Sequence, residues 1–161
     1  MDFIVRKKIA LTMSFTLVDS LPLPRVFNDS STERLIASNA LRLASTGPEM
    51  SDFWDATASQ LGLGSKIDAP AENAEERDSL RAEIDVVVAR DLFGLTLDEM
   101  RFLLDPTDVL GADCNFETFG ALKRAEEKAF DGHFRTRDLI LRTWDRLPIP
   151  HQAQAALVKQ A

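Results

Sequence analysis

Residues 80–105 read LRAEIDVVVARDLFGLTLDEMRFLLD, and this stretch predicts two helices that meet at a glycine corner. In its first half, apolar residues recur at i, i+4, i+7, i+8 and i+12, the spacing of a single buried stripe on a long helix. The stripe is Leu80, Ile84, Val87, Val88 and Leu92. The opposite face is charged and suits water, with Arg81, Glu83, Asp85, Arg90 and Asp91.

The corner itself has clear helix stop and start signals. Gly94 stands where a helix needs a left-handed C-terminal residue, and it has no Cβ to clash there. Thr96 is followed three residues later by Glu99, a capping-box pattern that predicts the start of a second helix. Asp105 precedes Pro106, whose ring disfavours helical geometry at the residue before it, so the second helix should stop there. Its expected buried face is Leu97, Met100, Leu103 and Leu104.

Further helical patterns flank this stretch. We expect helices near residues 30–46, 49–61, 116–130 and 136–147. Residues 106–115 are expected to form a turn-rich loop. Residues 13–21 partly alternate and are the best strand candidate, which pairs either in a small local sheet or with a neighbour outside the chain. The predicted fold is therefore mainly α, an irregular bundle of about six helices with a short β element near the N-terminus.

Two of the outer helices have predicted details. Ser30 and Glu33 form a capping-box pattern at the start of one helix, and Thr136 is the expected N-cap of the last. The helix over 49–61 is expected to bury Phe53, Trp54, Ala58 and Leu61. The last helix is expected to bury Ile140, Trp144 and Leu147.

Composition places the chain among globular proteins. Its 161 residues, 45% of them hydrophobic, correspond to about one domain. No apolar run approaches the roughly 18 residues that would span a membrane, and no secretory pattern is present, so we expect a cytoplasmic protein without a membrane partner. The single cysteine, Cys114, excludes an internal disulfide and any zinc site made of several cysteines.

The net charge of −7 is unevenly distributed. Residues 47–133 contain 20 acidic and eight basic side chains, whereas both ends of the chain are net basic. Phosphate contacts dominate the affinity of proteins for nucleic acid, so an acidic body is a poor DNA-binding surface. Candidate DNA contacts therefore lie at the ends of the chain.

Two groups of basic residues are the candidates. The first is Arg6, Lys7 and Lys8, which either contact phosphates or form a solvated helix face. The second is Arg135, Arg137, Arg142 and Arg146. On a helix, Arg142 and Arg146 lie four residues apart and share a face, which suits a ridge along a phosphate backbone. The alternative is ordinary ion pairs with Asp138 and Asp145.

No metal or catalytic site is expected. Asp105, Asp108 and Asp113 could supply oxygen ligands to Mg²⁺ or Ca²⁺, but the loop lacks the closing glutamate of an EF-hand and Asp105 is explained as a helix stop. Cys114 and His133 have no third group in the sequence pattern that would orient them as a catalytic pair.

Three blocks of the sequence resemble the C-terminal region of bacterial N6-adenine DNA methyltransferases from restriction–modification and phage-defence systems. They are DFIVRKKIALTMSFTLVDSLPLP at residues 2–24, RAEIDVVVARDLFGLTLDEMRFLLDPTDVLG at 81–111, and residues 116–147, which end in FRTRDLILRTWDRLP. In the first block, the matching residues are Arg6, Lys8, Thr12, Phe15, Leu21 and Pro22. Ala10 and Leu11 stand where the family has two glycines.

The resemblance implies a division of the chain and a role. Residues 1–25 would be the end of a recognition region that includes Thr12 as a DNA contact, residues 26–150 a helical C-terminal domain, and residues 151–161 a tail. The family's catalytic part binds S-adenosylmethionine through a glycine-rich turn and holds the flipped base with an Asn/Asp-Pro-Pro-aromatic motif. This chain has neither a Pro-Pro pair nor a GxGxxG pattern. It is therefore expected to be non-catalytic and without a cofactor of its own.

Two functions follow as hypotheses. The first is a module that supports DNA target binding in a methyltransferase, with DNA and either the catalytic part or another subunit as partners. The second is a protein-interaction module whose acidic helical body docks a partner subunit. The two differ in how binding should respond to salt, because DNA binding weakens steeply as salt rises.

Overall fold

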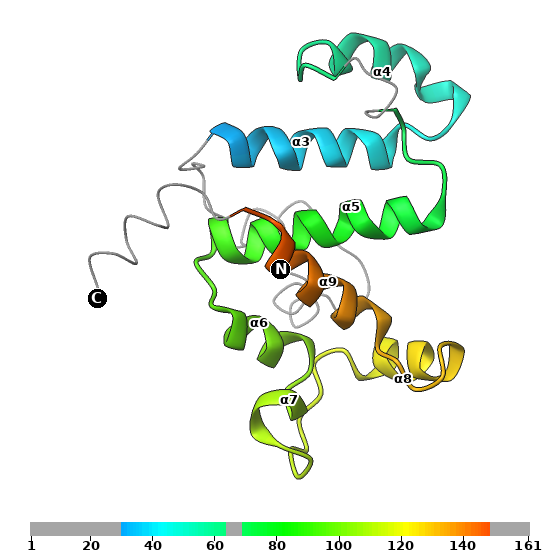
Figure 1. Ribbon diagram of the computed structural model, residues 1–161. Coiled ribbons are helices and arrows are strands. Elements are labelled where there is room, and N and C mark those ends of the chain that lie inside the picture. The colour runs from blue at the N-terminus through cyan, green and yellow to red at the C-terminus, as the bar shows by residue number, and fades with distance from the viewer. Residues whose placement is uncertain (1–29, 64–68, 149–161) are drawn as a thin grey trace, which may run out of the picture.

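The structure is a computed structural model that describes residues 30–63 and 69–148 (Figure 1). In these ranges the chain forms seven α-helices and no strand, which confirms the mainly α prediction. The helices are α3 (Ser30–Ala44), α4 (Ser51–Ala58), α5 (Ala74–Val87), α6 (Leu97–Leu104), α7 (Thr107–Leu110), α8 (Gly120–Ala129) and α9 (Arg135–Arg146). A 3₁₀ turn, η1 (Pro48–Met50), precedes α4, and a π-helical turn, η3 (Val88–Leu92), extends α5. The strand expected at residues 13–21 lies outside the described residues.

Helix α5 is the central element. It packs against α3 on one side and α9 on the other, and α9 in turn contacts α6 and α8 (Figure 1). Helix α4 lies beyond α3, on the side away from α5, while α6 and α7 lie on the opposite side of the molecule. No helix in the described ranges is long and apolar enough to cross a lipid bilayer.

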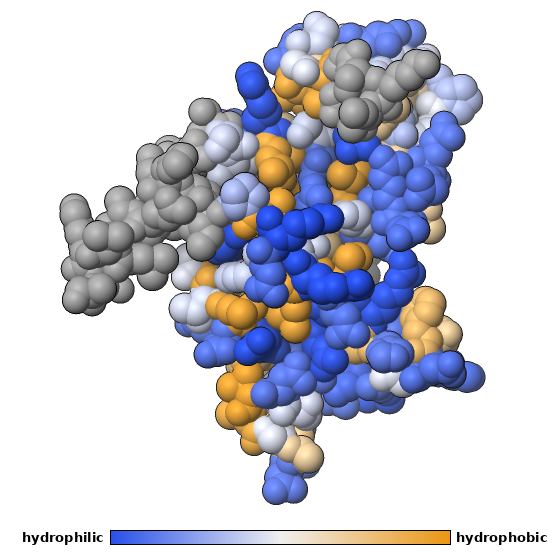
Figure 2. Space-filling model, in the orientation of Figure 1, coloured by the Kyte–Doolittle hydropathy of each residue, from blue (hydrophilic) through white to orange (hydrophobic). Residues whose placement is uncertain are grey.

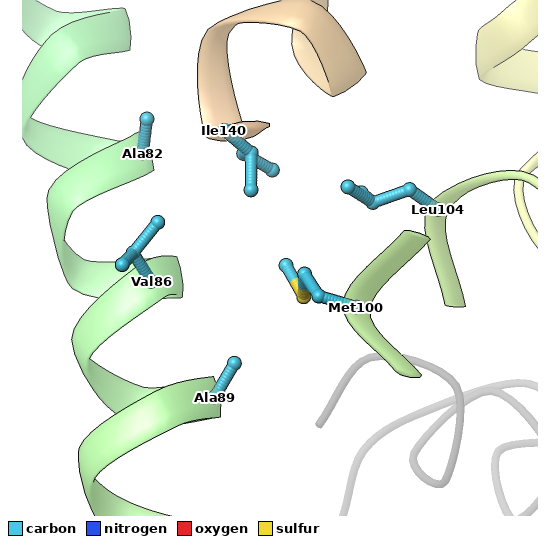
Figure 3. Packing of buried hydrophobic residues seen from close by; sticks show 6 residues of the cluster. All are labelled: Ala82, Val86, Ala89, Met100, Leu104 and Ile140. Carbon is cyan, nitrogen blue, oxygen red and sulfur yellow. The ribbon is translucent and has the colours of Figure 1, made fainter. Parts of the chain in front are cut away.

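The core forms where α5, α6 and α9 meet. Ala82, Val86 and Ala89 lie at i, i+4 and i+7 and face Ile140 of α9 (Figure 3). Met100 and Leu104 of α6 close the third side of this cluster. The small alanine side chains let α9 approach α5 closely, and Val86 is fully buried between them.

The predicted stripe on α5 is therefore only partly correct. Leu80 and Val87 are buried, but Ile84, Val88 and Leu92 are only half-buried. The sequence pattern allowed for one apolar face, whereas α5 packs against helices on two sides. The second face was missed because two of its three residues, Ala82 and Ala89, are small and give a weak hydrophobic signal.

The corner between α5 and α6 has the predicted geometry. Gly94 has φ +68°. The backbone N–H of Thr96 donates to Glu99 Oε2 at 2.8 Å, and the N–H of Glu99 donates to Thr96 Oγ1 at 3.3 Å, which confirms the capping box. Asp105 is extended and ends α6. The start of α5 has a cap as well, because Asn73 Oδ1 accepts a hydrogen bond from the N–H of Glu76 at 2.7 Å.

The predicted water-facing side of the long helix needs correction at Arg90 and Asp91. Both side chains are largely buried in the π-helical turn, where they pair at 2.7 Å. Arg90 also donates to the carbonyl oxygens of Leu147 and Pro148, each at 3.0 Å, and lies 5.9 Å from the ring centroid of Trp144. Arg90 therefore supplies hydrogen-bond donors to two backbone carbonyl groups just beyond the C-terminus of α9, where the helix no longer provides partners.

Four further details differ from the sequence predictions. Phe53 was expected inside, but it is 50% exposed because α4 turns Ala58 and the half-buried Trp54 toward the body. Part of the expected loop at 106–115 is helical, as α7. Helix α8 begins at Gly120 rather than at Phe116.

The fourth concerns the start of α9. Thr136 lies inside this helix rather than at its N-cap. Its N–H and hydroxyl both donate to the carboxylate of Glu126 on α8, at 2.7 and 2.6 Å. A carboxylate from a neighbouring helix therefore occupies the electropositive N-terminus of α9.

Truncation of the core should be far more costly than truncation of the surface. Leu104→Ala, at a side chain 5% exposed, is expected to lower the free energy of unfolding by about 2–5 kcal/mol, since it leaves a cavity between α6 and α9. Leu110→Ala is the matched control, because Leu110 is 61% exposed and its loss should change stability by less than about 0.5 kcal/mol. Urea unfolding followed by circular dichroism measures both. Equal effects of the two substitutions would contradict this description of the core.

Candidate interaction surfaces

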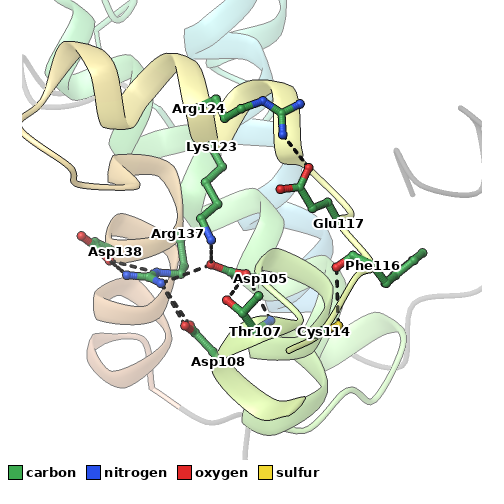
Figure 4. A network of polar contacts seen from close by, with 10 residues as sticks. All are labelled: Asp105, Thr107, Asp108, Cys114, Phe116, Glu117, Lys123, Arg124, Arg137 and Asp138. Atoms are coloured by element: carbon green, nitrogen blue, oxygen red, sulfur yellow. Dashed lines mark hydrogen bonds and ion pairs between the residues drawn. The ribbon is translucent and has the colours of Figure 1, made fainter. Parts of the chain in front are cut away.

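Arg137, one of the arginines predicted to contact DNA, lies at the centre of a network of ion pairs (Figure 4). Its Nη1 lies 3.0 Å from Asp108 Oδ1 and 3.6 Å from Asp105 Oδ2, and its Nη2 lies 3.0 Å from Asp138 Oδ1. Partial burial opposes the charged guanidinium. The hydrogen bond to Asp138 and the nearby carboxylates outweigh burial and raise the pKa of Arg137. The side chain is thus already bound to carboxylates of its own chain.

Asp105 holds the other side of this network. Its Oδ2 lies 2.5 Å from Lys123 Nζ on α8, and its Oδ1 accepts a hydrogen bond from the Thr107 hydroxyl at 2.7 Å. Burial disfavours the ionised carboxyl, but these bonds outweigh it and hold the pKa of Asp105 below its ordinary value. Asp105 therefore connects the end of α6 to α7 and α8 through hydrogen bonds to its carboxylate, and to α9 through the longer ion pair with Arg137.

This network also bears on the metal site considered from the sequence. Asp105 and Asp108, two of the three carboxylates in that pattern, are bound by Lys123 and Arg137. Among the residues that the structure describes, no group of three or more His, Cys, Asp or Glu side chains is arranged to hold a metal ion.

Two of the remaining α9 arginines bind carboxylates of α5. Arg135 Nη2 lies 3.0 Å from Asp78 Oδ2, and its guanidinium lies 5.3 Å from the ring centroid of Phe130. Arg146 Nη2 lies 2.9 Å from Glu83 Oε1. Arg135 and Arg146 therefore form ion pairs, as the alternative interpretation of this helix has it. Their partners lie on α5, however, and not on α9.

Arg142 differs from the other three. Its Nε donates to the backbone oxygen of Asp138 at 3.1 Å, and its side chain is exposed. Within the described ranges, no ion pair involves it. The other predicted DNA contacts, Arg6, Lys7, Lys8 and Thr12, lie outside the described residues.

Cys114 and His133 have separate neighbours. The thiol of Cys114 donates to the carbonyl oxygen of Phe116 at 3.7 Å, which is a weak contact. His133 Nδ1 lies 3.9 Å from Asp138 Oδ2, and the imidazole is largely exposed.

A cleft of about 300 Å³ lies between α5, α8 and α9. Asp78 on its wall binds both Arg81, at 3.1 Å, and Arg135, at 3.0 Å. Glu126, also on the wall, accepts hydrogen bonds from the N–H and hydroxyl of Thr136. These charged groups of the cleft are therefore matched within the chain, and they leave little to recognise a small charged ligand.

Large apolar side chains are exposed at several places among the described residues, and two of these places lie on opposite sides of the molecule. At and after α7, Val109, Leu110 and Phe116 are exposed, and Figure 2 shows hydrophobic surface in this lower part of the molecule. Phe53 is exposed on α4. Exposed apolar groups that gather at one place often mark sites where another protein binds.

No pattern in the sequence predicts the network of Asp105, Lys123 and Arg137. Its members lie 18 and 32 positions apart, so no local spacing rule brings them together. Local patterns identify these residues only individually, Asp105 as a helix stop and Arg137 as a basic side chain. Their pairing depends on how α8 and α9 pack against the end of α6.

Comparison of the chain with protein-family models, with curated proteins and with solved structures finds no match.

Removal of the Asp105 carboxylate should destabilise the fold in a pH-dependent way. Asp105→Asn is expected to lower the free energy of unfolding at pH 7 by about 2 kcal/mol, because it removes charge-assisted hydrogen bonds. The pKa of Asp105 is lowered in the folded state, so its contribution is complete above the ordinary value of 3.8 and is lost as the pH falls below it. The difference in free energy of unfolding between the unaltered chain and Asp105→Asn should therefore become smaller in acid.

Urea unfolding at pH 7, 4 and 3 measures that difference. Asp113→Asn, at an exposed carboxylate, is the control and should change stability little at any of these pH values. A difference for Asp105→Asn that stays constant down to pH 3 would contradict the role of the ionised carboxylate.

Proposed function

We propose that this chain is a non-catalytic helical module that acts by docking onto a basic surface of another protein. The observation that supports this best is that most of the α9 arginines are already paired with carboxylates. Arg135, Arg137 and Arg146 are bound to carboxylates of the same chain. A phosphate would have to displace those carboxylates before it could bind these arginines.

The charge of the chain supports the same proposal. A net charge of −7 repels nucleic acid at long range and attracts a basic protein surface. Complementary charge of this kind speeds encounter and suppresses wrong partners. Surface pairs of Arg and Asp neutralise part of the α9 side, so the uncompensated negative charge lies elsewhere on the body.

The resemblance described above suggests a partner. The catalytic part of an N6-adenine DNA methyltransferase would bind S-adenosylmethionine and DNA, and this chain would be its helical scaffold in a restriction–modification or phage-defence system. In this proposal the chain itself holds no cofactor and performs no chemistry.

A second candidate function, direct support of DNA binding, is favoured by Arg142. It is exposed, and among the described residues its guanidinium bonds to a backbone oxygen and to no carboxylate, so a phosphate could be bound without breaking an ion pair. Arg6, Lys7, Lys8 and Thr12 would add further contacts. Such contacts would be weak in the isolated chain and useful only within an assembly.

Co-expression with the proteins encoded by the adjacent reading frames tests the proposal. We expect one of them to co-purify with this chain and to carry net positive charge on the surface that it uses. Protein docking would be ruled out for these partners if none co-purifies and the isolated chain instead binds a labelled DNA duplex at physiological salt.

Substitution of the α9 arginines separates the two functions. Arg142→Ala combined with Arg146→Ala should leave co-purification unchanged, because neither residue belongs to an uncompensated acidic surface. If the second function holds, the same double substitution lowers the DNA affinity of the assembly about tenfold or more and reduces its salt dependence. Arg101→Ala combined with Arg124→Ala, two exposed arginines on α6 and α8, is the matched control. Gel-shift titrations at several salt concentrations provide the measurement.

A further inference from the structure

We propose that the outer face of α4 is the docking site, and that its occupant is a basic amphipathic segment of a partner protein in which Lys or Arg side chains flank a large apolar side chain. This inference rests on the proposed docking function and names the surface that performs it. The occupant is inferred from the chemistry of α4 alone.

The first observation is an aromatic side chain without cover. Phe53 is 50% exposed, although an aromatic residue of this size usually contributes to a core. Helix α4 attaches to the body through Ala58, which is buried, and Trp54, which is half-buried. Those contacts fix the orientation of the helix and leave Phe53 on the solvent side. In Figure 1, α4 lies at the edge of the molecule beyond α3, so a partner can reach it.

The second observation is the negative charge on α4 and in the turn before it. Asp52 and Asp55 lie on either side of the Phe53–Trp54 pair in sequence, and both are exposed, as is Glu49 in the preceding turn. Residues 43–63 contain no lysine or arginine. In the part of the chain that the structure describes, no ion pair involves these three carboxylates. In this they differ from the carboxylates that face α9, which pair with arginines of that helix.

These two features together select a partner chemistry. The aliphatic stem of a lysine or arginine covers an aromatic ring while its charged head reaches a carboxylate, and a cation over the ring face gains a further attraction. An apolar side chain between two such residues would cover Phe53. An acidic partner or a nucleic acid would meet three like charges on the same short stretch of chain, residues 49–55.

The exposed apolar side chains at and after α7 differ from Phe53 in the charge near them. Asp108 is bound by Arg137, and Glu117 is bound by Arg124 at 2.6 Å. Nearby charge therefore does not identify what would cover Val109 and Leu110. At the α4 face, by contrast, an exposed aromatic side chain and three exposed carboxylates lie within residues 49–55, and no ion pair involves these carboxylates among the described residues.

A designed peptide provides the probe. It is a labelled amphipathic helix of leucine and lysine, and its counterpart carries glutamate in place of lysine. Fluorescence anisotropy gives the affinity for the full chain. Emission from Trp54, recorded in a Trp144→Phe background that leaves Trp54 as the single tryptophan, reports whether binding occurs at α4.

Phe53→Ala should weaken binding of the lysine peptide about tenfold, the loss typical of a central aromatic contact in an interface. Asp52→Asn combined with Asp55→Asn should weaken it severalfold at low salt and reduce its salt dependence. Matched controls are Phe93→Ala, at another exposed phenylalanine, and Asp98→Asn combined with Asp113→Asn, at exposed carboxylates elsewhere. These controls should bind as the unaltered chain does, and circular dichroism should be the same for all variants.

The outcomes separate this inference from the function on which it rests. If the lysine peptide binds but the α4 variants bind as tightly as the unaltered chain, the α4 site is wrong while docking onto a basic surface stands. If the unaltered chain does not bind the lysine peptide, or binds the glutamate peptide equally well, both are wrong. Loss confined to the α4 variants, with a shift in Trp54 emission, supports both.

Discussion

Close packing of α5 against α9 is the interaction on which the rest of the structure depends. Ala82, Val86 and Ala89 present a smooth face into which Ile140 of α9 packs. Because two of the three are alanine, the two helices come close enough for polar groups on their flanks to meet. The ion pairs between α5 and α9 exist only as a consequence of that approach. The ion pairs therefore depend on the apolar packing, and the apolar packing does not depend on them.

The charged side chains extend this packing to the smaller helices. Asp105 is buried at the end of α6, and it bonds to Lys123 of α8 and lies near Arg137 of α9. A buried carboxylate is costly unless it is paired, so the position of each of these helices is tied to the others. Glu126 adds a second link between α8 and α9 by capping the N-terminus of α9. The half of the molecule around α9 is thus stabilised by groups that depend on one another.

The same arrangement shapes what the surface can recognise. On the α9 side, positive and negative groups largely neutralise each other, so little charge is left there to bind a phosphate backbone. On and next to α4, three exposed carboxylates accompany an exposed phenylalanine, and among the residues that the structure describes no ion pair involves them. An acidic protein therefore presents two unlike surfaces, and α4 is the one that suits a basic protein partner. Composition alone gives the net charge but not this division.

Local features of the chain could be predicted from the sequence because they depend on residues close to one another. The glycine corner at Gly94, the capping box of Thr96 and the stop at Asp105 follow from backbone sterics and short-range hydrogen bonds. The helical class follows from the spacing of apolar residues. What only the tertiary structure decided is which faces meet and which charges pair. Arg137 is a basic residue in any conformation, but two of its three carboxylate partners, Asp105 and Asp108, come from the end of α6 and from α7. That outcome depends on contacts between residues far apart in sequence, which no local pattern encodes.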